Sequence, residues 1–82
     1  MPKACPDFRN YSFYVNPEDG HWHNAAHLHV KWPDDSSVLL LPTLMVLAGD
    51  PLPRDVREYI AANLEEIVRN WNLYNPLREV EQ

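Results

Sequence analysis

The feature that most constrains the fold is an amphipathic repeat in the last third of the sequence. Apolar residues recur there at helical spacing, and charged residues occupy the positions between them. The apolar stripe consists of Val56, Ile60, Leu64, Ile67, Val68 and Trp71. Pro53 suits the first turn of a helix, Asp55 and Glu58 lie near its positive end, and the Asn-Pro pair at 75–76 ends it. We therefore predict one long C-terminal helix over residues 53–74, whose stripe needs a second layer to cover it.

A stretch of strict alternation predicts that this second layer is a β-sheet. In residues 27–32, one face carries Leu28, Val30 and Trp32, and the opposite face carries His27, His29 and Lys31. Residues 11–15 are also rich in strand formers, and the turn residues at 33–36 predict a hairpin into 37–41. We expect a small antiparallel sheet of three to four strands within residues 10–48. The sheet and the helix together make an α+β fold.

The size of the chain predicts a single domain over residues 1–82. A chain of 82 residues has room for one small core, and its 45% hydrophobic content suffices to build that core. We expect residues 1–9 to be a lead-in and residues 76–82 to be a tail. The helical stripe is predicted to pack against the apolar side chains of the strands, which are Leu28, Val30, Leu39 and Leu41.

Cysteine usage and hydropathy predict a cytoplasmic protein without membrane contact. Cys5 is the only cysteine, so no disulfide can form within the chain, and a reducing compartment is expected. The opening MPKACPDF lacks the apolar run of a signal peptide, and no stretch approaches the ~20 apolar residues of a membrane span. Cys5 falls in the predicted lead-in, which does not offer the held geometry that thiol catalysis needs.

The charge balance limits the kinds of partner. Twelve Asp and Glu against seven Lys and Arg give a net charge of −5. This balance argues against direct nucleic-acid binding, because phosphates call for a basic footprint. It favours a protein partner with a basic surface instead.

Six carboxylates are the candidates for contacting such a partner. They are Asp34, Asp35, Asp55, Glu58, Glu65 and Glu66. The first two mark the predicted hairpin turn, and the other four would span about 16 Å along one helix face. Such a row could imitate a short stretch of nucleic-acid backbone, although Arg54 and Arg69 interrupt it. The alternative interpretation is an ordinary solvated helix face.

Four histidines within eleven positions form the second candidate site. The stretch GHWHNAAHLHV holds His21, His23, His27 and His29, and the chain has no other histidine. Two His-x-His pairs could converge on one Zn²⁺, which accepts imidazole nitrogen in a tetrahedral site. The competing interpretation is structural, because a half-solvated strand places polar rings on the face opposite its apolar alternation. We favour the structural or partner-contacting role and expect no cofactor, with zinc as the alternative.

The segment HNAAHLHV, followed by LAGDPLPRDVREYIAANLEEIVRNW, resembles the bacterial domain of unknown function 4160 over approximately residues 8 to 75. Members of that family often have Pro-Pro where this chain has Ala25 and Ala26. The resemblance implies no particular reaction. Some members are encoded beside small partner proteins in pairs that look like toxin–antitoxin modules, which implies a protein-binding role.

These observations predict a small, acidic, non-enzymatic protein that binds and inhibits or regulates a macromolecular partner. Antitoxins and the anti-defence or anti-CRISPR inhibitors of phages are similar in size and charge. We expect a monomer or a small homo-oligomer. The alternative is a metal-dependent enzyme, such as a nuclease-like toxin, that uses the four histidines.

Overall fold

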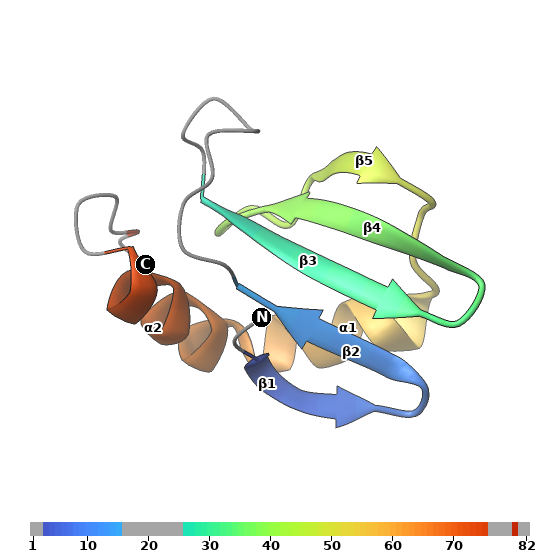
Figure 1. Ribbon diagram of the computed structural model, residues 1–82, viewed down its shortest axis with the longest axis horizontal. Helices are drawn as coiled ribbons and strands as arrows, with labels where there is room; N and C mark the ends of the chain where they lie inside the picture. The colour runs from blue at the N-terminus through green and yellow to red at the C-terminus, as the bar shows by residue number, and fades with distance from the viewer. Residues whose placement is uncertain (1–2, 16–25, 76–79, 81–82) are drawn as a thin grey trace.

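The computed structural model describes residues 3–15, 26–75 and 80. Within them the chain forms five strands followed by two helices. They are β1 (Lys3–Phe8), β2 (Tyr11–Tyr14), β3 (His27–Trp32), β4 (Asp35–Leu40), β5 (Val46–Gly49), α1 (Arg54–Ala62) and α2 (Leu64–Tyr74). The strands make one antiparallel sheet in the order β1-β2-β3-β4-β5 (Figure 1). The predicted α+β class is confirmed.

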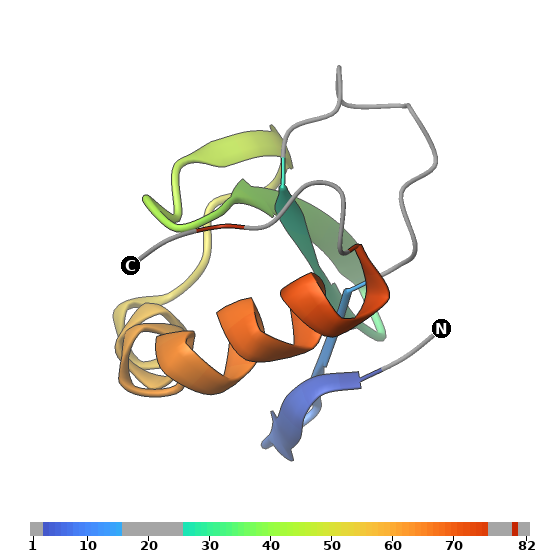
Figure 2. The same cartoon turned by 90° about the vertical axis from the view of Figure 1, so that its left-hand side faces the viewer.

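The sheet curves around the helices. Figure 1 looks onto one face of the sheet, with α1 behind the strands and α2 below them beside β1. Figure 2, turned by 90°, shows both helices on the same side of the sheet. Neither helix in the described part of the chain has the length and apolarity needed to cross a membrane.

Strand alternation places the core between the sheet and the helices. Leu28 and Val30 on β3 are fully buried, and their cross-strand partners include Leu39 on β4 and Phe13 on β2. From the helices the core receives Val56, Ile60, Ile67 and Trp71, all at most 1% exposed. Burying a side chain of this kind stabilises the fold by about 1.5–3 kcal/mol. The predicted packing of the helical stripe on the strands is confirmed, except that Leu64 is only partly buried and Val68 is buried outside the shared core cluster.

The prediction of one long helix was wrong, because the helical segment divides at Asn63. This residue has φ −108° and ψ 13°, outside the usual helical range. Its Nδ2 atom donates a hydrogen bond to the carbonyl oxygen of Tyr59 at 2.8 Å. An asparagine side chain that hydrogen-bonds nearby backbone competes with regular helical bonding, which explains the break.

The prediction of three to four strands was also too low, because the expected lead-in contains β1. Ala4 and Cys5 are both buried, and the pairing of β1 with β2 shifts register twice. These irregularities remove the clean alternation that identifies a strand in a sequence. Pro6 lies within β1, which suits the edge position that this strand has in the sheet.

Candidate functional site

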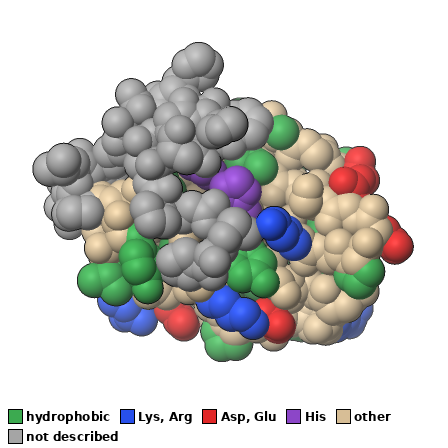
Figure 3. Space-filling view, viewed as in Figure 1, with side chains coloured by type: hydrophobic (Ala, Val, Ile, Leu, Met, Phe, Trp, Pro, Cys, Tyr) green, Lys and Arg blue, Asp and Glu red, His purple; other side chains and the backbone are tan. Residues whose placement is uncertain are grey.

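Three aspartates come together where β4 begins and β5 ends. Asp34 lies in the β3–β4 turn, and Asp35 is the first residue of β4. Asp50 directly follows β5, and the pairing of Ser37 with Gly49 brings it beside Asp35. The two carboxyl groups lie close enough for each to change the pKa of the other. We call Asp34, Asp35 and Asp50 the acidic corner, and Figure 3 shows acidic side chains at the end of the molecule where β3 turns into β4.

Gly49 makes this juxtaposition possible. Its φ is +91°, a conformation that L side chains rarely adopt. A Cβ atom there would collide with the carbonyl oxygen of Ser36 and lie 2.7 Å from the Cα of Ser37. The Ser37 hydroxyl donates a hydrogen bond to the carbonyl of Ala48 at 3.2 Å, which further ties β5 to β4. The backbone therefore holds Asp50 next to Asp35.

The electrostatics of the acidic corner follow from this contact. The pKa of Asp50 is raised, first by its hydrogen bond with Asp35 and then by the charge of that carboxylate. The pKa of Asp35 is lowered, because it accepts hydrogen bonds from Asp50 and from the Ser36 amide, the latter at 2.8 Å. Such a pair titrates as one coupled unit. All three aspartates are exposed, and none forms an ion pair with any residue of the described ranges.

The four carboxylates predicted on one helix face differ from the acidic corner in their partners and lie on two separate helices. Asp55 pairs with Arg9 at 2.6 Å, and Glu58 pairs with Arg54 at 2.8 Å. Both carboxylates therefore already have a cationic partner within the protein. These residues belong to α1, whereas Glu65 and Glu66 belong to α2, so the four carboxylates do not line one continuous helix.

The two acidic side chains of α2 also differ from each other. Glu65 is exposed, whereas Glu66 is half-buried. The negative charge of Glu66 contributes to the raised pKa of both Cys5 and Tyr59, although burial is the larger cause in each case. Glu66 therefore lies close enough to Cys5 and Tyr59 for its charge to act on both of them.

His27 lies deeper in the structure than a half-solvated strand face would place it. His27 is 2% exposed, and its ring lies 5.3 Å from that of Trp71 and 4.9 Å from that of His29, measured between centroids. His29 is half-buried, and the Nε2 atoms of both rings are enclosed. The expectation of a solvated histidine face was therefore wrong for His27, because α2 brings Trp71 against it.

The metal hypothesis concerns four histidines, of which two can be located. His21 and His23 lie outside the described residues. Among the residues that the structure does place, no group of three or more His, Cys, Asp or Glu side chains could hold a metal ion. His27 and His29 by themselves supply fewer ligands than the three protein ligands of a catalytic zinc site.

Sequence reasoning missed Asp50 as a member of the acidic corner. In the sequence, Asp50 stood out only as part of the segment LAGDPLP, which carries the family resemblance. Whether Asp50 lies beside Asp35 depends on which strand β5 pairs with and in which register. The local sequence does not contain that information.

Comparison of the chain with protein-family models, with curated proteins and with solved structures finds no match in any of the three.

Proposed function

We propose that this protein is a small, non-enzymatic, cytoplasmic binding protein whose acidic corner docks on a basic surface of a partner protein, which it inhibits or regulates. The observation that carries the proposal is the exposed pair of Asp35 and Asp50, which the pairing of β4 with β5 holds side by side. Two adjacent carboxylates repel each other when both are ionised, and a Lys or Arg side chain placed between them relieves that repulsion. No such cation comes from the part of the chain that the structure describes.

The contrast with the helices supports the choice of this surface. The carboxylates of α1 already have arginine partners, so a basic protein would have to displace those contacts. The acidic corner requires no such exchange. The net charge of −5 adds attraction at longer range.

Two further considerations support an inhibitor or antitoxin role. The resemblance to the bacterial domain of unknown function 4160, with its paired gene arrangements, points to a protein partner. A cluster of exposed carboxylates can also take the place of nucleic-acid phosphates in a basic groove. We therefore propose a nucleic-acid-binding protein as the partner.

The first test uses a cationic peptide of alternating Lys and Gly, titrated into the protein and followed by NMR and calorimetry. We expect shifts at the amides of the acidic corner and weaker binding at high salt. The triple variant Asp34→Asn/Asp35→Asn/Asp50→Asn should bind about five- to ten-fold more weakly, because exposed ion pairs are individually small. Glu58→Gln is the matched control, and it should bind like the original protein.

The pH dependence gives a second readout. The pKa of Asp50 is raised, so binding should weaken as pH falls through that pKa. In Asp35→Asn, the pKa of Asp50 should return toward its ordinary value, which carboxyl ¹³C NMR measures directly. Equal binding by the triple variant and the original protein would show that another surface carries the interaction.

A further inference from the structure

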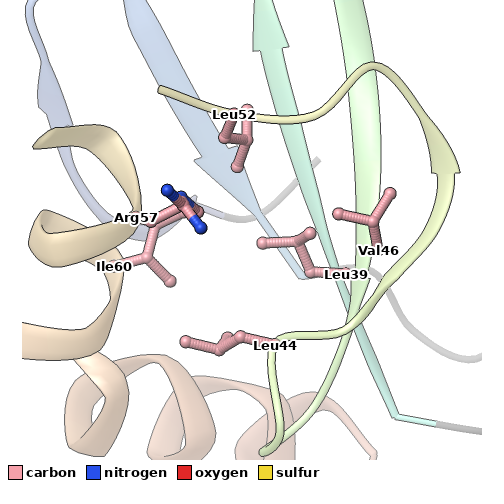
Figure 4. Close-up of a pocket in the computed structure, with 6 residues that line it drawn as sticks. All are labelled: Leu39, Leu44, Val46, Leu52, Arg57 and Ile60. Atoms are coloured by element: carbon pink, nitrogen blue, oxygen red, sulfur yellow. The ribbon is translucent and has the colours of Figure 1, made fainter. Parts of the chain in front are cut away.

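A small apolar pocket lies at the end of β5 away from the acidic corner. Its lining residues are Leu39, Leu44, Val46, Leu52, Arg57 and Ile60. Figure 4 shows these side chains converging on one space from β4, β5, the connecting segments and α1. The cavity is about 60 Å³, several times the ~10–15 Å³ that a cavity needs to hold one water molecule. It therefore has room for the end of one apolar side chain.

The pocket opens beside an edge strand with little protection against pairing. Within the described sheet, no strand pairs with the second edge of β5. β1, at the opposite edge, carries Lys3, Pro6 and Asp7, which discourage the addition of another strand. β5 contains neither a charged residue nor a proline, although its pairing with β4 shifts register once. At its start, Met45 and Val46 are 63% and 41% exposed.

Arg57 adds a positive charge at the pocket. The other charged side chains of α1 are Arg54, Asp55 and Glu58, and each of them forms an ion pair. Arg57 forms no ion pair with the residues that the structure places, and it is exposed. A guanidinium group whose aliphatic stem lines an apolar pocket suits a ligand with an apolar side chain and a nearby carboxylate.

We propose that β5 and this pocket bind an extended peptide segment of a partner protein that carries a large apolar residue and, two positions away, Asp or Glu. The segment adds to the sheet as a further strand beside β5. The apolar side chain enters the pocket, and the carboxylate pairs with Arg57. The spacing of two follows from strand geometry, because residues i and i+2 share a face about 6.5–7 Å apart. This surface is separate from the acidic corner, so the inference goes beyond the function proposed above.

The probe is the peptide acetyl-Thr-Val-Leu-Thr-Glu-Thr-amide, titrated into ¹⁵N-labelled protein. We expect amide shifts along β5 and at Leu44 and Arg57. Replacing the peptide Glu by Lys should weaken binding by about two- to five-fold, and replacing Leu by Ser should weaken it further. Arg57→Glu should reverse the preference, so that the Lys peptide binds better than the Glu peptide. Because Arg57 is exposed, this variant keeps the fold.

Filling the pocket provides an independent variant. Val46→Phe should close the pocket mouth and abolish the advantage of Leu over Ser in the peptide. Leu73→Ala, which changes a 69% exposed apolar residue on α2, is the control and should bind the peptide normally. The acidic-corner triple variant should also bind it normally, which separates this inference from the proposed function.

Two results would overturn the inference. One is equal affinity, or no affinity, for the Leu–Glu, Leu–Lys and Ser–Glu peptides. The other is a dimer in light scattering that Val46→Phe converts to a monomer, since the edge of β5 would then serve a second copy of this chain.

Discussion

Burial determines what the thiol of Cys5 can do. This side chain is 3% exposed and lies on β1 near Tyr59 and Glu66. Burial, followed by the negative charge of Glu66, raises its pKa to about 12. At pH 8 only about one molecule in ten thousand would then carry the reactive thiolate. Cys5 is therefore a core residue whose buried thiol is poorly suited to act as a nucleophile.

The raised pKa predicts a loss of stability at alkaline pH. The thiol stays protonated in the folded protein and ionises in the unfolded chain above its ordinary value of 9.0. Its contribution to stability is therefore complete below pH 9 and is lost as pH rises from 9 toward about 12. The slope should not exceed about 1.4 kcal/mol per pH unit. The measurement is urea unfolding of the original protein and Cys5→Ala across this range.

The difference between the two slopes reports the thiol together with its effect on Tyr59, whose pKa Cys5 raises in addition to burial. Cys5→Ala should lose less stability per pH unit, whatever its absolute stability. A thiol reagent should also label the folded protein slowly at pH 8 and the urea-unfolded protein quickly. Identical slopes, or fast labelling of the folded protein, would contradict the burial argument.

At the scale of elements, local pattern predicted the layers, whereas the irregular elements depended on tertiary contacts. The alternation through β3 and the helical stripe were visible because each repeats a simple period. The break at Asn63 was not visible in the sequence, because the stripe of apolar residues continues across it from Ile60 to Ile67. β1 was missed because two consecutive residues within it, Ala4 and Cys5, are both buried, so the strand lacks the usual alternation of buried and exposed residues.

Trp71 tests the predicted contact between helix and sheet. It is fully buried in α2, against the ring of His27 at the start of β3. Trp71→Ala should lower the free energy of unfolding by about 3–5 kcal/mol, a large part of the ~5–15 kcal/mol typical of a domain. Leu73→Ala, on the exposed side of the same helix, should change it by less than about 0.5 kcal/mol. Urea unfolding of both variants checks the difference, and equal effects would contradict the packing.

At the scale of the whole molecule, the sequence predicted the sign of the candidate surface and named Asp34 and Asp35 within it, whereas the position of Asp50 beside them depends on the fold. The net charge of −5 was available from composition. Which carboxylates remain available depends on pairing between distant residues, such as Arg9 with Asp55. The contact between Asp35 and Asp50 likewise depends on the order and register of β4 and β5. The net charge can thus be calculated from the sequence, but the distribution of charge over the surface depends on the fold.

The metal alternative is best tested on the folding of the whole chain. The described residues bury an apolar core shared by both layers, and this core should sustain the fold without a metal. We therefore expect thermal unfolding to be unchanged by EDTA and raised by less than about 2 °C by added Zn²⁺. A zinc site filled at 100 times its Kd would add ~2.7 kcal/mol, which for a domain of this size means a shift of about 10 °C or more.

The informative variant is His21→Asn/His23→Asn rather than a substitution of His27, because His27 packs in the core and its loss would lower stability with or without a metal. We expect the double variant to melt like the original protein in EDTA and in Zn²⁺. A large zinc-induced shift that disappears in this variant would establish a metal site and would favour the metal-dependent alternative over the binding function proposed here.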